Sequence, residues 1–297
     1  MRVLRRSTLG TAAALACGLA GPAAAAPFVF STGAANGLIA TASRPGPSSG
    51  LNQETESADD FVIVGARTQI NAATFTGLVP AGASVSSVTV EMYRVFPNDS
   101  DTGRTSGPPT FSTAKVPTRV NSPSDVALDS RSSGSGLGYT TTVLTPSFTA
   151  QNSVDTGINP KPSQTTGGEG SVTGQEVQFN VTFTSPFTLD PDHYFFVPQV
   201  LLTNPGDHFR WLSASRPIVA TGTPFPPGAA DLQAWIRNAQ LDPDWLRIGT
   251  DIVGAGTFNM AFTLNGQTVP EPAAVATFAA GLLGLALMRR STGRRGR

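Results

Sequence analysis

The sequence predicts an all-β fold, a sandwich of two antiparallel sheets with jelly-roll-like connections. Charged residues make up only 13% of the chain, about half the usual share, and Ser, Thr, Gly and Pro take their place. Apolar and polar residues alternate over short runs, as they do in strands that bury one face. Gly- and Pro-rich turns separate these runs, so the pattern indicates short strands rather than helices.

The strands expected from this alternation follow one another through the whole central part of the chain. The clearest covers residues 85–96, with Val88, Val90 and Met92 on one face. Residues 176–184 alternate strictly, with Val177, Phe179, Val181 and Phe183 on one face. In order, the expected strands cover residues 27–31, 57–64, 68–79, 85–96, 140–148, 176–184, 194–202, 209–213 and 257–264. One stretch, Ala229–Asn238, instead has the apolar spacing of a short helix.

The first 26 residues have the layout of a secretory signal peptide. Arg2, Arg5 and Arg6 precede an apolar run at 8–21, and small residues for a signal peptidase follow it. The arginine pair only partly matches a twin-arginine signal, so twin-arginine export stays open beside general secretion. Cys17 is the only cysteine and leaves with this peptide, so the mature domain must be stabilised by its apolar core and not by a disulfide.

At the other end, an apolar run is followed by a cluster of arginines. The run from Ala273 to Met288 carries no charge, and as a helix it would be roughly 24 Å long, slightly short of a hydrocarbon core of about 30 Å. Arg289 and Arg290 could reach the headgroups and make up the difference. The arginines would hold the C-terminus in the cytoplasm and leave the preceding domain outside. A plain tail anchor and a buried C-terminal helix are the alternatives.

This run, preceded by Val-Pro-Glu-Pro and followed by arginines, resembles the PEP-CTERM sorting signal of Gram-negative surface proteins. The residues that carry the resemblance are Val269, Pro270, Glu271, Pro272, Arg289 and Arg290. The resemblance implies cleavage by the membrane peptidase exosortase, usually in bacteria that make exopolysaccharide. It divides the chain into a signal peptide at 1–26, a β-sandwich domain at 27–268 and a sorting signal at 269–297 with a transmembrane helix at 273–288. An inner-membrane precursor would give a protein at the cell surface or outside the cell.

The charge balance changes once both ends are removed. The whole chain has 20 basic and 20 acidic residues, but the two end segments contain eight of the arginines and only one glutamate. Residues 27–270 therefore carry a net charge of about −7. An acidic surface of this kind disfavours nucleic acid and anionic lipid as partners of the domain.

Carboxylates offer two candidate ligand sites. Asp99 and Asp101 lie in a turn-rich segment that places oxygen ligands at alternate positions before a glycine, as calcium loops do. Pro109 stands where an EF-hand has its bidentate glutamate, so a looser calcium site and a solvated turn are the alternatives. Asp59 and Asp60 come at the start of a strand, where they would either line a pocket or cap a turn. Calcium is the only cofactor that these patterns suggest.

The three tryptophans fall close together, at Trp211, Trp235 and Trp245, and the last two each precede an aliphatic residue and an arginine. If they are exposed, Trp235 and Trp245 would suit stacking on sugar rings. If they are buried, they would hold a long connection against the sandwich. We expect the second arrangement.

Catalytic signals are weak. His193 and His208 have neither cysteines nor a histidine partner at helical spacing, so no zinc site is expected. Residues 46–50 match G-x-S-x-G formally but lack the strand and helix that would raise a nucleophilic serine. We therefore expect a non-enzymatic, exported surface or extracellular-matrix protein. The alternatives are a carbohydrate-binding module, with exopolysaccharide as partner, and a polysaccharide-active hydrolase with two facing carboxylates.

Overall fold

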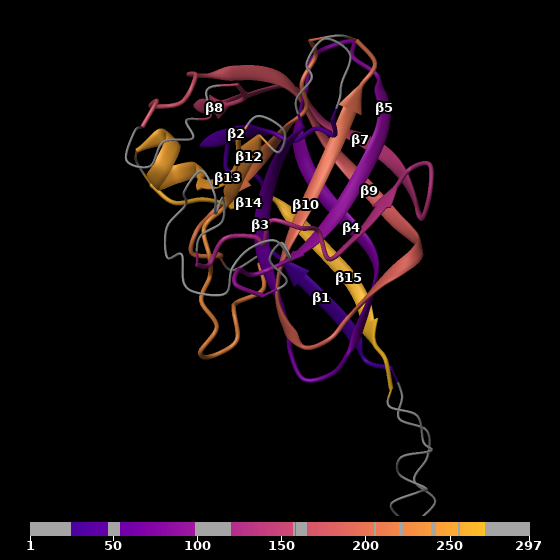
Figure 1. Ribbon diagram of the computed structural model, residues 1–297. Helices are drawn as coiled ribbons and strands as arrows, with labels where there is room; N and C mark the ends of the chain where they lie inside the picture. The colour runs from indigo at the N-terminus through magenta and orange to yellow at the C-terminus, as the bar shows by residue number, and fades with distance from the viewer. Residues whose placement is uncertain are drawn as a thin grey trace, which may run out of the picture. The chain divides into compact units, whose positions relative to one another are not determined.

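The computed structural model describes residues 25–46, 54–98, 120–156, 158, 165–204, 206–219, 222–238, 242–254 and 256–270. Residues Ala25–Val269 form one compact unit. This unit is mostly strand, with two sheets rich in antiparallel pairs and almost no helix (Figure 1). The all-β prediction is therefore confirmed. The predicted signal peptide up to residue 24 and the sorting tail from residue 271 lie outside the described residues.

One sheet has nine strands built around β4, which pairs with β9 along its whole length and with β15 and β11 along the opposite edge. β7 continues the sheet beyond β9, β1 continues it beyond β15, and the parallel pair β2–β8 lies beyond β11. The strands are β1 (Pro27–Ser31), β2 (Ile39–Ala42), β4 (Thr68–Val79), β7 (Leu137–Ala150), β8 (Asn152–Val154), β9 (Val172–Leu189), β11 (Arg210–Ala214), β14 (Asn259–Met260) and β15 (Phe262–Thr268).

The other sheet has six strands in the order β13-β12-β3-β10-β5-β6. Its strands are β3 (Thr55–Ile63), β5 (Val85–Arg94), β6 (Asp129–Ser132), β10 (Asp192–Leu202), β12 (Trp235–Asn238) and β13 (Asp242–Arg247). A single π-helical turn, Ile248–Val253, follows β13.

The helix predicted at Ala229–Asn238 is wrong. The chain is irregular up to residue 234 and then forms β12. Trp235–Asn238 pairs with β3 on one side and with β13 on the other. Backbone hydrogen bonds to two neighbouring strands outweigh the weak helical spacing of ten residues, because tertiary context overrides local propensity.

The main core lies between the two sheets. Phe196 of β10 stacks on Phe262 of β15 with ring centroids 5.1 Å apart, so a residue of one sheet packs on a residue of the other. Phe75 and Phe179, from adjacent strands, stack at 4.8 Å. Trp211 is fully buried against Phe196 and Phe262, and its Nε1 donates a hydrogen bond to the Ala261 carbonyl. The alternation read in β9 therefore marks its core-facing side.

A second apolar cluster covers the outer face of the six-stranded sheet. It consists of Ala58, Tyr93, Phe195, Val197, Trp235 and Trp245. Side chains of β3, β10, β5 and β12 that point away from the main core therefore pack on one another and on β13. This cluster is the support on which the candidate site is built.

The first and last strands of the domain, β1 and β15, lie side by side. Pro27 of β1 is opposite Gln267 of β15 in an antiparallel pair (Figure 1). The Ala26 amide donates to the Thr268 hydroxyl, and the Thr268 amide donates to the Ala26 carbonyl, both at 2.8 Å. The chain thus enters and leaves the domain at one end of one sheet.

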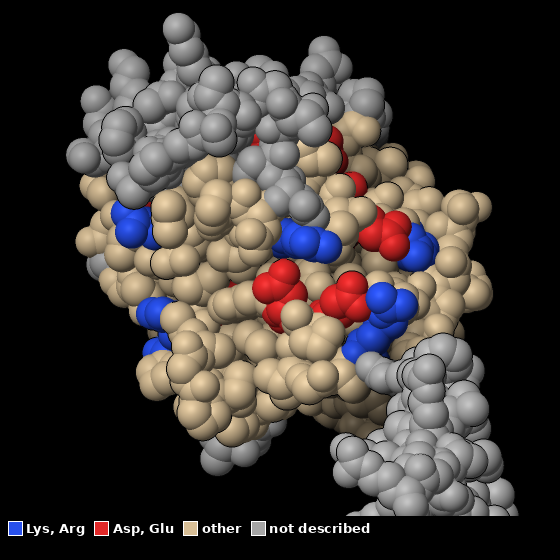
Figure 2. Space-filling view, turned by 60° about the horizontal axis from the view of Figure 1, so that its bottom comes forward, with Lys and Arg blue, Asp and Glu red and all other residues tan. Residues whose placement is uncertain are grey.

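The surface reflects the low content of charged residues. The face turned to the viewer in Figure 2 is mostly uncharged, and several of its acidic side chains lie next to basic ones. Among the described residues, no helix is long and apolar enough to cross a membrane.

Candidate acidic site

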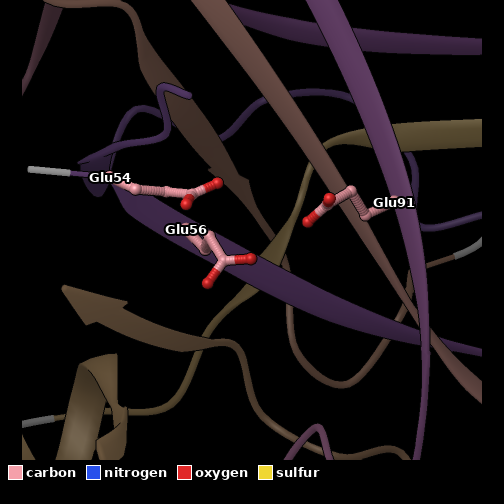
Figure 3. A group of neighbouring side chains, drawn as sticks. All are labelled: Glu54, Glu56 and Glu91. Atoms are coloured by element: carbon pink, nitrogen blue, oxygen red, sulfur yellow. The ribbon is translucent and has the colours of Figure 1, made fainter. Parts of the chain in front are cut away.

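Three glutamates meet on the outer face of the six-stranded sheet. Glu54 directly precedes β3 and Glu56 is the second residue of the strand, so in extended backbone the two share a face. Glu91 lies on β5, opposite Val197 of β10, the strand that separates β3 from β5. Figure 3 shows the three carboxyl groups turned toward one another. One oxygen of each lies within 4.8 Å of the others.

Glu56 is the centre of the cluster and is only 1% exposed. Arg237 lies opposite Glu56 in the β12–β3 pair, and its Nε forms an ion pair with Glu56 Oε2. Tyr93 Oη donates a hydrogen bond of 2.6 Å to Glu56 Oε1 and accepts one of 3.1 Å from Arg237 Nη2. The Arg237 guanidinium also lies over the Trp245 ring, 4.5 Å from its centroid. Both oxygens of Glu56 are therefore engaged by buried partners.

The surroundings of Glu91 favour its protonated form. Tyr93 Oη lies 3.0 Å from Glu91 Oε2 as well as 2.6 Å from Glu56, but a hydroxyl has one proton to donate. Burial and the neighbouring charges of Glu56 and Glu54 raise the pKa of Glu91 to about 8. Burial alone would also raise the pKa of Glu56, but the charge of Arg237 holds it below its ordinary value. These shifts favour a proton on Glu91 and a negative charge on Glu56 near neutral pH.

Glu54 completes the group at its solvent side. Its Oε1 accepts a hydrogen bond of 3.0 Å from Gln199 Nε2. Burial and the charge of Glu56 raise the pKa of Glu54. Three carboxyl groups could supply oxygen ligands to Ca²⁺, but calcium prefers six to eight of them. Arg237 already neutralises Glu56, so the arrangement suits a shared proton better than a divalent cation.

A glycoside hydrolase would need two carboxyl groups in different protonation states, such as Glu91 and Glu56. Substrate, however, has to reach both of them. Glu56 is buried, and Arg237 and Tyr93 occupy its oxygens. The geometry therefore favours a buried network that fixes strands β3, β5 and β12 relative to one another, and it does not supply an accessible acid–base pair.

Glu91→Gln is expected to make the protein more stable at high pH. The pKa of Glu91 is raised from 4.5 to about 8 in the folded state, so the folded protein binds this proton more tightly than the unfolded chain. The free energy of unfolding must then fall as pH rises through this window. Glutamine keeps the donor and cannot ionise. Urea unfolding should show the variant more stable by on the order of 2–4 kcal/mol at about pH 9 and equal near pH 4.

Asp190→Asn is the matched control, since Asp190 is exposed and its carboxylate forms an ion pair with exposed Arg67. Its pH profile should match that of the parent protein. A Glu91→Gln variant whose stability differs from that of the parent by the same amount at both pH values would contradict the proton assigned to Glu91.

Known proteins offer no guide to this site. The chain matches no protein-family model, no curated protein and no solved structure. The site must therefore be interpreted from its own geometry.

Asp59 and Asp60 do not form a surface pocket with each other or join the three glutamates. Both are buried. Asp59 Oδ2 accepts a hydrogen bond of 2.7 Å from the Met260 amide, and Asp60 Oδ2 accepts one of 3.1 Å from the Leu232 amide and lies 2.6 Å from His193 Nε2. Burial raises the pKa of Asp60 to about 6. The pair ties β3 to the segments before β12 and before β15.

Of the other predicted ligands, Asp99 and Asp101 lie outside the described residues, as do the serines of residues 46–50. Trp235 and Trp245 are only 3% and 0% exposed, so neither can stack on a sugar. The buried arrangement expected from the sequence is the observed one. Trp245 Nε1 donates a hydrogen bond of 3.1 Å to the Ser124 carbonyl, which holds the segment after residue 120 against the sheet.

A second buried network was not expected from the sequence. Asp155 accepts hydrogen bonds from Arg44 Nη1 at 3.0 Å and from Arg210 Nη2, and it lies 2.6 Å from His208 Nδ1. Burial alone would raise the pKa of Asp155, but the hydrogen bond with His208 and the charges of Arg210 and Arg44 lower it to about 2. His193 and His208 thus each pair with a buried carboxylate, as structural histidines do.

Proposed function

We propose that this chain is an exported, non-enzymatic β-sandwich protein of the Gram-negative cell surface or extracellular matrix, sorted through its PEP-CTERM tail. The observation that carries the proposal is the position of the Val-Pro-Glu-Pro sequence. The compact unit ends at Val269, directly after β15, where this sequence begins. A sorting signal must be separable from the folded domain, and a boundary at this residue supports that role.

Exosortase is the processing partner in this proposal, and the membrane holds the precursor through residues 273–288 before cleavage. Extracellular polymer, including exopolysaccharide, is the environment of the released domain. The proposal includes jelly-roll-like connectivity, because β9, β10, β11 and β12 alternate between the two sheets, as successive strands of jelly rolls do. The burial of Glu56 supports a non-enzymatic role.

Released protein is expected to lack both end segments. Mass spectrometry of extracellular material should recover peptides of the domain and none from residues 1–26 or 273–288. Replacing Pro270, Glu271 and Pro272 with alanines should leave the chain in the membrane fraction, because the peptidase loses its recognition sequence. Release of the alanine variant at the parental rate would refute the proposed sorting role.

The matched control for the sorting test replaces another proline pair, Pro226 and Pro227, with alanines. These residues lie in an irregular stretch of the domain between β11 and β12. Release of this variant should be unchanged, which would separate the tail signal from a general effect of losing prolines.

A further inference from the structure

A groove lies on the outer face of the nine-stranded sheet, on the side away from the main core. Its volume is about 320 Å³, within the range of about 300–1,000 Å³ that is common for ligand sites. Polar side chains line its floor: Ser31, Thr74, Thr76, Thr263, Gln178 and Glu176. They come from β1, β4, β15 and β9, four strands that the sheet brings side by side.

The strand register arranges the polar side chains in rows. Thr263 lies opposite Ser31 and opposite Thr74, Thr74 lies opposite Asn180, and Asn180 lies opposite Thr140. The row crosses five strands and is therefore roughly 19 Å long at the usual strand spacing. A neighbouring row carries Thr76 and Gln178. Ser31, Thr263 and Thr74 of this row line the groove, and the row continues beyond it along the sheet face. The groove is therefore part of an extended array of hydroxyl and amide groups, long enough for a chain and not only for one small molecule.

Two internal hydrogen bonds orient this array. Ser31 Oγ and Thr263 Oγ1 lie 2.8 Å apart, and Thr145 Oγ1 donates to Glu176 Oε2 at 2.8 Å. The residues on both sides of the floor are small or apolar, with Ala34 and Ala35 following β1 and Leu144 on β7. Leu144 is 49% exposed. The groove thus combines prearranged polar groups with apolar contacts at its sides.

The chemistry of the lining selects a ligand class. Hydroxyls both donate and accept hydrogen bonds, and the glutamine amide offers both functions as well. Among the residues that the structure describes, no Lys or Arg lines the groove and Glu176 is its single charge, so an anionic ligand would lack a counter-charge from them. A neutral, polyhydroxylated chain matches the floor through its hydroxyls and the sides through its C–H faces.

We propose that this groove binds a neutral oligosaccharide or polysaccharide chain. The inference rests on the proposed function for its extracellular partner and goes further by assigning the site and the uncharged class of sugar. Binding uses hydroxyl and amide contacts on a sheet face and does not involve the buried tryptophans.

The test measures binding by the purified full chain with isothermal titration calorimetry. The probes are neutral hexasaccharides of glucose, mannose and galactose in α and β linkages, with a hexauronate as the charged counterpart. At least one neutral probe should bind saturably and more tightly than the hexauronate. Thr76→Val removes one hydroxyl while it keeps the shape of the side chain, and Gln178→Ala removes the amide. Each should weaken binding roughly tenfold, the loss of about one hydrogen bond.

Ala34→Trp should abolish binding, because the larger side chain at an exposed position fills the groove. Thr182→Val is the matched control, since Thr182 is exposed on β9 and does not line the groove. It should bind like the parent protein, and all variants should keep the parental melting temperature. Absence of binding to every neutral probe, preference for the hexauronate, or binding that survives both Thr76→Val and Ala34→Trp would overturn the proposal.

The outcome is independent of sorting. The calorimetric test uses purified chain and does not depend on cleavage of the tail, whereas the release assay does not depend on the groove. A failure of sorting with intact binding, or the reverse, therefore identifies which of the two proposals is wrong.

Discussion

Arg237→Met is expected to lower the free energy of unfolding by about 3–5 kcal/mol, because it leaves Glu56 as an uncompensated buried charge. Glu56 is 1% exposed, and Arg237 is its ion-pair partner. Methionine retains much of the length of the side chain and its contact with the Trp245 ring, so the loss would come mainly from the charge. Urea unfolding at neutral pH measures the effect.

The double variant Glu56→Gln/Arg237→Met separates charge from packing. With no carboxylate to bury, it should recover most of the lost stability, since a neutral amide can still accept the hydrogen bond from Tyr93. The control Arg67→Met removes an exposed arginine that pairs with exposed Asp190 and should leave the unfolding free energy essentially unchanged. A double variant as unstable as Arg237→Met alone would show that the guanidinium acts through packing.

The local sequence pattern predicted strands with strict alternation better than it predicted a segment whose structure depends on the strands that pair with it. The alternation in residues 176–184 identified β9 and its buried face, because one side of that strand packs on the core. In residues 229–238 the apolar spacing pointed to a helix, whereas Trp235–Asn238 became a strand between two others. The information that decided this outcome lies in β3 and β13, and no local window contains it.

The candidate site was missed for the same reason. The spacing of Glu54 and Glu56 already places them on one face of a strand. Glu91 joins them only because β10 lies between β3 and β5, and Arg237 reaches Glu56 across 181 positions of sequence. The sequence signal for Arg237 was the repeated Trp-aliphatic-Arg pattern, because the Arg237 guanidinium lies over the indole of Trp245. Its carboxylate partner could not be predicted without the sheet order.

Trp245→Ala is expected to be the most damaging substitution of an apolar side chain in the cluster on the outer face of the six-stranded sheet, with a loss of about 3–5 kcal/mol in the free energy of unfolding. Trp245 is 0% exposed. Its ring packs edge-on against Tyr93 at 5.7 Å and lies under Arg237 at 4.5 Å. Alanine would leave a cavity, and Tyr93 and Arg237, which both contact Glu56, would lose their packing against the indole.

The companion variants show which property of the indole matters. Trp245→Phe keeps an aromatic ring but leaves the Ser124 carbonyl without its 3.1 Å donor, so a smaller loss of about 1–3 kcal/mol is expected. Val143→Ala, at a side chain that is 51% exposed, should leave the melting temperature unchanged. Thermal unfolding of the three variants gives the ranking. A stable Trp245→Ala protein that had lost sugar binding would instead mean that the indole faces a ligand, and it would move the glycan site from the groove to the opposite sheet.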